Sequence, residues 1–407
     1  MNVKIIPQRL HGTITPPPSK SQAHRAIIAA SLAEGRSFMQ NVRASQDITA
    51  TLGCMTALGA KAVWQDDAIE IWGIGDRRQT DMPRFDCGES GSTLRFLIPI
   101  ALAISEGGIF CGRGRLMRRP QDPYFSIFQE KGIAFSQGSD TLSIKGSLTP
   151  GEFRLPGNIS SQFITGLLYA LPLLHGDSEI ILTTELESSG YIDMTVDMLQ
   201  QFGVFLERTK RGWHIPGNQK YQPQNVAVEA DYSQAAFFYA AKGLGNDIRI
   251  EGMNPDSHQG DKRILNFEAR LNEPGLVELD VRECPDLVPA LAARAAFRPE
   301  QTTHIVNAGR LRLKESDRLA AITAVFHSLG AEIVEESEGL LIYGKDNLYG
   351  GVTVDAWNDH RIAMMTAIAA SRCKNTVTIT GAECVRKSYP SFWKDYMALG
   401  GRLEMIE

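Results

Sequence analysis

The sequence has few of the features that mark membrane, secreted or nucleic-acid-binding proteins. Its most apolar stretches, residues 96–104 and 164–174, are much shorter than the roughly 18 residues that a membrane-spanning helix needs. The first 20 residues contain no apolar core of the kind found in secretory signals. Because 42 basic residues are outnumbered by 47 acidic ones, a broad nucleic-acid-binding surface is not favoured. We therefore expect a cytoplasmic protein with no membrane or nucleic-acid partner.

Cysteine is scarce, and the arrangement of the few cysteines excludes two further classes of protein. None of the six forms a C-x-x-C pair or a zinc-like grouping with histidine, so we expect reduced, mostly buried thiols and no metal site. The chain also contains no P-loop, nucleophile elbow, G-x-G-x-x-G fingerprint or zincin motif. Disulfide scaffolds and the enzymes recognised by those motifs are therefore excluded.

The sequence does contain an internal repeat. A helical segment, a glycine and a pair of strands recur, and the glycines that follow the helices are Gly59, Gly132, Gly203, Gly330 and Gly400. Between these units lie six apolar segments with polar starts, anchored at Gln22, Thr93, Ser161, Ser233, Asp286 and Asp359. The fourth spacing is 53 residues, whereas the others are 68 to 73, so the fourth copy is shortened. The pattern predicts six α/β units, each containing one buried helix.

The length indicates how these six units are grouped. A chain of 407 residues exceeds the roughly 250–300 residues that one hydrophobic core organises, so two domains of three units each are expected. The stretch PGNQKYQPQN, at residues 216–225, is the best linker near the midpoint because it is rich in proline and asparagine.

Polar residues at the starts of the buried helices are candidates for an anion site. For each residue alone, helix capping is the simpler interpretation. Cations are electrostatically unfavourable at helix N-termini, however, and this chain places several there. An anionic ligand would explain both features. The cations are Lys20, Arg25, Arg95, His360 and Arg361.

Two basic segments and several carboxylates add to this set. The segment at residues 111–123 contains four arginines, and solvation or nucleic-acid binding would also account for it. In residues 311–319, Lys314 and Arg318 would share one face if the segment is helical, although ordinary surface ion pairs would explain them equally well. The acid–base candidates are Asp286, Glu315, Asp317 and His360.

Taken together, these segments resemble the 5-enolpyruvylshikimate-3-phosphate (EPSP) synthase family. The resemblance covers nearly the whole chain, and ten motifs occur in the family's order. They are SKSQAHR (19–25), GESGSTLR (88–95), RP (119–120), SSQF (160–163), SGYIDMT (189–195), EADYS (229–233), PD (285–286), KESDR (314–318), DHRIAM (359–364) and KSYP (387–390).

The resemblance implies both a fold and a reaction. The fold is α/β: two similar domains, each made of three β-α-β-α-β-β repeats around buried helices, known as an inside-out α/β barrel. Residues 20–225 would form one domain and residues 1–19 plus 226–407 the other, with the active site in the cleft between them. The enzyme would transfer the enolpyruvyl group of phosphoenolpyruvate to the 5-hydroxyl of shikimate 3-phosphate and release phosphate. It would act as a monomer on small molecules, without a metal or organic cofactor.

The resemblance also assigns residues to the two substrates. Asp286 matches the proton acceptor and Glu315 the proton donor. The shikimate 3-phosphate residues would be Lys20, Ser21, Arg25, Ser160, Ser161, Gln162, Ser188, Tyr191, Asp286 and Lys314. The phosphoenolpyruvate residues would be Lys20, Gly91, Arg119, Gln162, Arg318, His360, Arg361 and Lys387. The two substrates together carry two phosphates as well as carboxylate charge, and a phosphate monoester alone carries nearly two negative charges at pH 7. Binding them side by side therefore requires several cations.

The chain departs from the family's pattern at two places. Glu89 stands where Asn is more common, which puts a carboxylate beside the predicted phosphoenolpyruvate site. Arg310 stands where Asn is usual, so no substrate contact is carried over to it.

The alternatives are UDP-N-acetylglucosamine enolpyruvyl transferase, an RNA 3′-phosphate cyclase with a similar repeat, and a non-catalytic binding protein with the same fold. The amino-sugar enzyme commonly has a functional cysteine in its Arg-Pro loop. Cys111 lies eight residues before Arg119, at the end of a predicted strand, and we expect it to be a small buried hydrophobic residue.

Overall fold

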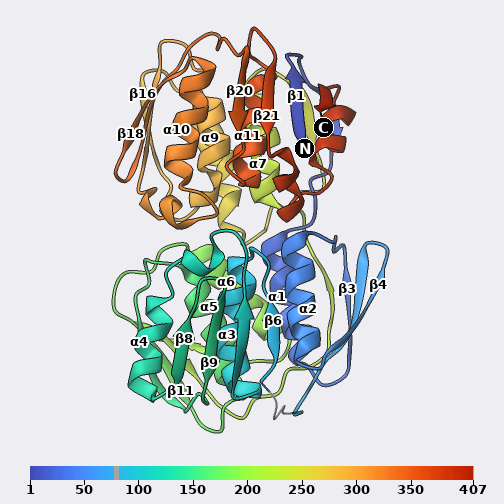
Figure 1. Ribbon diagram of the computed structural model, residues 1–407, viewed down its shortest axis with the longest axis vertical. Coiled ribbons are helices and arrows are strands. Elements are labelled where there is room, and N and C mark those ends of the chain that lie inside the picture. Colours follow the sequence, from blue (N-terminus) through green and yellow to red (C-terminus); the bar gives the residue numbers. More distant parts are fainter. Residues whose placement is uncertain (78–81, 407) are drawn as a thin grey trace. The chain divides into compact units, whose positions relative to one another are not determined.

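The computed structural model describes residues 1–77 and 82–406, which divide into two compact units. One unit contains Met1–Pro17 with Ala230–Glu407, and the other contains Pro18–Glu229. The chain therefore passes from one unit to the other twice. As a result, the first strand and the last strand of the chain belong to the same unit (Figure 1).

The unit of residues 18–229 contains three four-stranded sheets that share one strand pattern. In each, the first two strands are parallel, and the third and fourth are added antiparallel. In spatial order, the first sheet is β14 (Asn225–Ala227), β3 (Arg36–Gln40), β5 (Ala68–Trp72) and β4 (Lys61–Gln65). The second is β6 (Arg84–Asp86), β7 (Gly107–Cys111), β9 (Thr141–Lys145) and β8 (Ala134–Gln137). The third is β10 (Gly151–Leu155), β11 (Ser178–Leu182), β13 (Gly212–Ile215) and β12 (Glu207–Arg208).

The helices of this unit are of two kinds. The buried helices are α1 (Lys20–Leu32), α3 (Gly91–Ile104) and α5 (Ser161–Ala170), and the helices α2 (Gln46–Ala57), α4 (Asp122–Lys131) and α6 (Ser189–Gln201) each keep one exposed face. Short 3₁₀ turns are η1 (Leu116–Arg118) and η2 (Leu171–Leu173). Helix α3 is apolar on nearly all sides, as a helix must be when it packs within a core.

The unit of residues 1–17 and 230–407 contains two complete sheets of the same pattern and one shortened sheet. One complete sheet is β16 (Leu276–Asp280), β17 (Thr302–Val306), β19 (Gly339–Tyr343) and β18 (Glu332–Glu336). The other is β20 (Val352–Asp355), β21 (Val377–Thr380), β1 (Asn2–Ile6) and β22 (Arg402–Ile406). The remaining sheet is only the parallel pair β15 (Asp247–Ile250) and β2 (His11–Ile14). The antiparallel pair is missing from the fourth copy, which confirms the predicted shortening.

Three buried helices lie side by side in the core of this unit (Figure 1): α7 (Tyr232–Gly243), α9 (Val288–Ala295) and α11 (His360–Ala370). Every residue of α9 and α11 is buried. The other helices are α8 (Ile264–Arg270), α10 (Arg318–Leu329) and α12 (Phe392–Ala398). The 3₁₀ turns are η3 (Gly260–Arg263), η4 (Pro285–Leu287), η5 (Gly309–Leu313) and η6 (Ala382–Lys387).

Side-chain caps begin five of the six buried helices. The capping residues are Ser19, Ser90, Ser160, Asp231 and Asp359, each of which accepts a hydrogen bond from a backbone N–H of the first turn. Ser21, Ser92, Ser161 and Ser233 therefore lie inside the first turns and are not the capping residues. Serine hydroxyls beyond those needed for capping are thus present at the helix starts.

Residues 311–319 do not form one helix. Turn η5 ends at Leu313, and α10 begins only at Arg318, because the Asp317 carboxylate caps it by accepting from the Ala320 N–H at 3.2 Å. The condition under which Lys314 and Arg318 would share a helical face is therefore not met. The turn between them nevertheless brings both side chains to one carboxylate, as described below.

Candidate active site

In the unit of residues 18–229, Arg25 is a buried cation that links α1 to α6. Its Nε donates to Thr195 Oγ1 at 2.8 Å, and its Nη atoms donate to the carbonyls of Ser21, at 2.7 Å, and Tyr191, at 2.8 Å. Burial lowers the pKa of Arg25 to about 10, so the side chain stays charged at neutral pH. The structure thereby brings together Ser21, Arg25 and Tyr191, three of the candidate residues.

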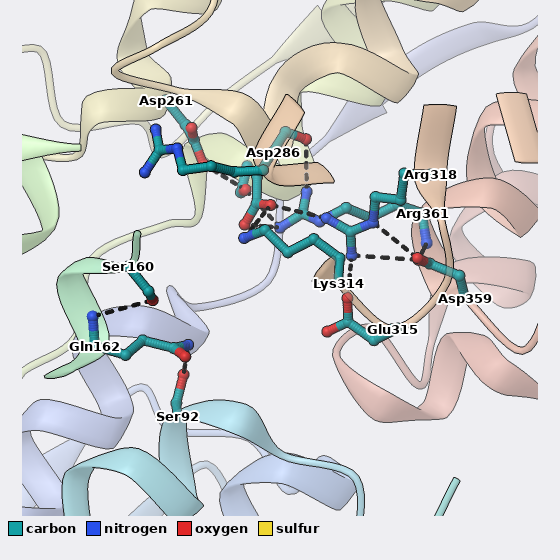
Figure 2. Close-up of polar contacts among 12 residues, drawn as sticks. Ser92, Ser160, Gln162, Asp261, Asp286, Lys314, Glu315, Arg318, Asp359 and Arg361 are labelled. Carbon is teal, nitrogen blue, oxygen red and sulfur yellow. Dashed lines mark hydrogen bonds and ion pairs between the residues drawn. The ribbon is translucent and has the colours of Figure 1, made fainter. Parts of the chain in front are cut away.

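Gln162 is held by hydrogen bonds to the cap of its own helix, α5, and to side chains of α3. Its backbone N–H donates to Ser160 Oγ at 3.3 Å, and its Nε2 donates to Ser92 Oγ on α3 at 3.0 Å (Figure 2). Arg95, also on α3, donates through Nη1 to Gln162 Oε1 at 3.0 Å. The amide orientation of Gln162 is therefore fixed, because Oε1 accepts from a cation while Nε2 donates to a hydroxyl.

Gly91 lies against the same group at the start of α3. A Cβ atom at this position would be 2.7 Å from Arg119 Nη1 and 3.4 Å from Gln162 Oε1. Arg95 also donates to the Pro120 carbonyl at 2.9 Å, which holds the segment that carries Arg119. Gly91, Arg119 and Gln162 are thus neighbours, and the absence of a side chain at Gly91 gives the guanidinium its room.

Three further predicted residues lie at helix starts of this unit. Lys20, the first residue of α1, forms an ion pair with Asp47 of α2 at 2.7 Å. Ser161 is the first residue of α5. Ser188 is buried and precedes α6 with left-handed backbone angles, φ 58° and ψ 44°. The structure therefore places all the predicted residues of this unit at or beside the starts of α1, α3, α5 and α6.

In the other unit, Asp286 of η4 is surrounded by three cations (Figure 2). Arg318 Nη1 lies 2.8 Å and Lys314 Nζ 3.1 Å from Asp286 Oδ1, and Arg361 Nη2 lies 3.2 Å from Oδ2. Burial by itself would raise the pKa of Asp286, but the charges of Arg361, Lys314 and Arg318 outweigh it and hold the pKa well below its usual range. Asp286 is therefore a carboxylate in this state of the protein.

Arg318 connects Asp286 to two further carboxylates. Its Nη2 lies 2.6 Å from Glu315 Oε2, and its Nε lies 2.7 Å from Asp359 Oδ2. Only 1% of the Arg318 side chain is exposed, and Asp359 is fully buried. Burial would lower the pKa of Arg318, but the three carboxylates more than compensate and raise it. Asp286 and Glu315 therefore contact neighbouring nitrogens of one fixed guanidinium.

The start of α11 completes this cluster. Arg361 donates to the Asp286 carbonyl at 3.1 Å as well as to its carboxylate. Lys387 of η6 reaches the same helix start by donating to the Asn358 carbonyl at 2.5 Å. His360 is buried, with Nδ1 3.9 Å from Asp359 Oδ1. All the predicted residues of this unit are thus at or beside η4, the start of α10 and the start of α11.

The sequence-based assignment omitted several residues that the structure places in the two groups. Arg95 was recognised only as a cation near a helix start, although it lies one helical turn after Gly91. Asp359 was recognised as a cap, and its bond to Arg318 crosses 41 residues of sequence. Asp47 and Thr195 had no signal at all, because their partners on α1 are 27 and 170 residues away.

Cys111 differs from expectation. It does end strand β7, but it is only partly buried and lines a cavity of about 400 Å³ with Arg84, Asp86 and Arg113. The other five cysteines are buried, as expected. Part of Cys111 is accessible because it is the last residue of its strand and lines the cavity together with residues of β6 and β9.

The described residues contain neither a metal-binding cluster nor a membrane-spanning helix. Within residues 1–77 and 82–406 there is no group of three or more His, Cys, Asp or Glu side chains that could hold a metal ion. In the same part of the chain, no helix combines the length and apolar character needed to cross a membrane.

The sequence matches one protein family over nearly its full length. The model of the family described as EPSP synthase (3-phosphoshikimate 1-carboxyvinyltransferase) matches residues 5–396. The 3-phosphoshikimate 1-carboxyvinyltransferase of Clostridium acetobutylicum is 49% identical over 420 residues, covering 98% of this chain and 97% of the relative. The enzyme of the same name from Clostridium beijerinckii is 46% identical over 425 residues, covering 98% of each chain.

Solved structures show the same fold. An EPSP synthase from Acinetobacter baumannii superposes with a TM-score of 0.81 at 24% sequence identity, covering 100% of both chains. An enolpyruvyl transferase from Streptomyces tendae gives a TM-score of 0.78 at 17% identity, covering 99% of this chain and 98% of the other. At these identities the likeness concerns the fold alone.

Proposed function

Because the chain belongs to the EPSP synthase (3-phosphoshikimate 1-carboxyvinyltransferase) family, we propose that the two groups of residues described above bind its two substrates. The protein is a transferase of the shikimate pathway. It moves the enolpyruvyl group of phosphoenolpyruvate to the 5-hydroxyl of shikimate 3-phosphate. The alternatives raised by the sequence, the amino-sugar transferase and the RNA cyclase, are therefore set aside.

Asp286 is the proposed proton acceptor for the 5-hydroxyl, and Glu315 is the proposed proton donor to the methylene carbon of phosphoenolpyruvate. One observation carries this assignment: both carboxylates contact Arg318, at 2.8 and 2.6 Å. An acid and a base must face one bound substrate pair, and a shared guanidinium holds them at a fixed separation. The fixed separation lets one group take a proton as the other gives one.

The cations around Asp286 have a second role in this proposal. Arg318, Arg361 and Lys387 would hold the carboxylate and phosphate of phosphoenolpyruvate, while Lys314 would contact shikimate 3-phosphate. Bound anions would compete with Asp286 for Lys314 and Arg361, which lie 3.1 and 3.2 Å from it. As these cations turn to the substrates, the pKa of Asp286 rises and the carboxylate becomes a stronger base. Substrate binding thus activates the acceptor.

The group of residues in the other unit would hold the rest of both substrates. Shikimate 3-phosphate would be bound by Lys20, Ser21, Arg25, Ser160, Ser161, Gln162, Ser188 and Tyr191. Phosphoenolpyruvate would contact Lys20, Gly91, Arg119 and Gln162. Helix starts suit this task because their free N–H groups and positive dipole ends attract phosphate. The proposed site thus draws on both units, and His360 is a buried polar neighbour of its cations.

The direct test is phosphate release. We expect phosphate to appear only when shikimate 3-phosphate and phosphoenolpyruvate are both present, with the enolpyruvyl ether formed in equal amount. Replacement of shikimate 3-phosphate by UDP-N-acetylglucosamine should give no phosphate. Release with the amino sugar, or none with shikimate 3-phosphate, would contradict the proposal.

Gly91→Ala is expected to raise the KM for phosphoenolpyruvate about tenfold. The added Cβ would come within 2.7 Å of Arg119 Nη1, which is the mobile end of a long side chain and therefore moves away without disturbing the fold. A displaced guanidinium loses a charge-assisted hydrogen bond to the anion, an interaction worth roughly tenfold or more in binding. Steady-state kinetics at saturating shikimate 3-phosphate measures the change.

Gly53→Ala is the matched control, because it makes the same change in an exposed helix where a Cβ would meet nothing within 4 Å. Its KM should stay within twofold of that of the unaltered protein, with stability equal or slightly higher. An unchanged KM in Gly91→Ala, or an equal rise in both variants, would remove Arg119 from the proposed site.

Binding of shikimate 3-phosphate alone should depend on residues of both units. Ser161→Ala, at the start of α5, and Lys314→Met, beside Asp286, are each expected to raise its Kd about tenfold, because each removes a hydrogen bond to a charged group. Isothermal titration calorimetry measures Kd without turnover. Exposed Ser136→Ala and Lys394→Met serve as controls. An effect confined to one unit would mean that this substrate binds to that unit alone.

We also propose that the enzyme works as a cytoplasmic monomer on small molecules. All six cysteines are free thiols, and five are buried, which suits a reducing compartment. Light scattering at micromolar concentration would test the oligomeric state.

A further inference from the structure

Asp261 is a buried carboxylate near the proposed site to which the mechanism above gives no role. It lies in η3, between α7 and α8 in sequence, and only 4% of it is exposed. The Ser233 hydroxyl donates to Asp261 Oδ2 at 2.5 Å, and Arg361 Nη2 donates to the same Ser233 oxygen at 2.8 Å. Figure 2 shows Asp261 beside the cluster of Asp286 and Arg361. A hydrogen-bonded chain therefore leads from Asp261 through Ser233 to Arg361.

The direction of the hydrogen bonds in this chain is determined by its first member, Asp261. An ionised carboxylate only accepts hydrogen bonds, so the Ser233 hydrogen must point to Asp261. The lone pairs of Ser233 are then available to the Arg361 N–H. Arg361 has Asp286 as its other partner, so the guanidinium is held from two sides.

We propose that Asp261 is a positioning residue that orients Arg361, through the Ser233 hydroxyl, for the anionic groups of phosphoenolpyruvate. The inference rests on the proposed function, because it takes Arg361 to be a ligand of that substrate. Asp261 acts only when ionised. A protonated Asp261 can donate to Ser233 itself, and the Ser233 hydroxyl is then no longer confined to one orientation.

The surroundings of Asp261 make its charge dependent on pH near neutrality. The groups that face it are Asp231, the capping residue of α7, Asp286 of η4, Cys284 just before η4, and Arg361 on α11. Burial and the negative charge of Asp286 raise the pKa of Asp261 to about 6, although Arg361 opposes the rise. Asp261 is therefore ionised at pH 8 and able to fix the Ser233 hydroxyl, whereas at pH 5 it is mostly protonated and no longer confines that hydroxyl to one orientation.

The test is the ratio of kcat/KM for phosphoenolpyruvate between the unaltered protein and Asp261→Asn, measured from pH 5 to pH 8. Substrate phosphates also titrate near pH 6, but their ionisation affects both proteins equally and cancels in the ratio. We expect a ratio of about ten at pH 8, from loss of a charged partner in the chain, falling toward one at pH 5. The lower kcat/KM of Asp261→Asn should result mainly from a higher KM for phosphoenolpyruvate.

Two further variants complete the test. Asp256→Asn removes an exposed carboxylate from the same segment and should give a ratio of one at every pH. In a Ser233→Ala background, Asp261→Asn should have almost no further effect, because the link is already broken. A ratio that does not change with pH, or full additivity of the two substitutions, would overturn the proposal. If the unaltered protein releases no phosphate from the two substrates, the proposed function itself is wrong.

Discussion

Asp286→Asn and Glu315→Gln should each lower kcat about 100-fold or more, the scale of a lost general acid or base. Both changes keep the size of the side chain and remove its ability to exchange a proton. Substrate binding should persist in both variants. In Asp286→Asn the three cations lose an anionic competitor, so the Kd for shikimate 3-phosphate should stay the same or fall.

Single-turnover phosphate release and calorimetric titration separate these effects. Asp280→Asn is the matched control, because its carboxylate is about half exposed on the same segment and should leave kcat unchanged. If kcat stays within a few-fold in both Asp286→Asn and Glu315→Gln, the assignment of acceptor and donor is wrong. A loss of substrate affinity that accounts for the whole effect would make these carboxylates ligands and not proton carriers.

Arg318→Gln should destabilise the protein by about 3–5 kcal/mol and abolish measurable turnover. Removal of this guanidinium leaves the fully buried Asp359 without its ion-pair partner, and uncompensated buried charges have a cost of this size. Asp286 and Glu315 lose their common support at the same time. In a domain of this size the change corresponds to a fall in Tm of roughly 10 °C. Differential scanning calorimetry and the phosphate assay measure the two effects.

Arg312→Gln provides the comparison on the same unit. Arg312 also pairs with two carboxylates, Asp317 at 3.0 Å and Glu335 at 2.6 Å, but it is 30% exposed. Ion pairs at the surface contribute about 0–1 kcal/mol to the free energy of unfolding. The Tm of Arg312→Gln should therefore fall by no more than about 3 °C, and its turnover should be normal. Equal effects of the two substitutions would show that burial does not determine the strength of the Arg318 cluster.

The repeat could be predicted from the sequence because its signals are local. Each signal lies within a few tens of residues. The signals are the apolar helices, the glycines that follow the partly exposed helices, and the shortened fourth spacing. Gly132 and Gly330, for example, do have left-handed backbone angles at helix ends, φ 69° and 89°. The helix considered between Lys314 and Arg318 does not form for an equally local reason, since Asp317 makes a better cap than an interior residue.

The site was only partly predictable, because its contacts join distant segments. The motifs identified Asp286 and Arg318 as candidates, but nothing in the sequence indicated that one guanidinium holds Asp286 and Glu315 together. The partner of Lys20 was likewise hidden, because Asp47 looks like an ordinary residue in the first turn of α2. Residue types at helix starts can be predicted, whereas the pairing of charges requires the folded chain.

The position of β1 has a consequence for synthesis of the chain. This strand lies between β21 and β22, with Val3 opposite Ile379 on one side and Met405 on the other. The ribosome makes β1 long before both of its neighbours, β21 and β22, which are synthesised only after residues 7–376. The segment of residues 18–229 has no such delay, so it can fold while translation continues. Until the end of the chain is released, both edges of β1 are unpaired and could pair with strands of other chains. The nascent chain therefore needs to be kept from aggregating at β1.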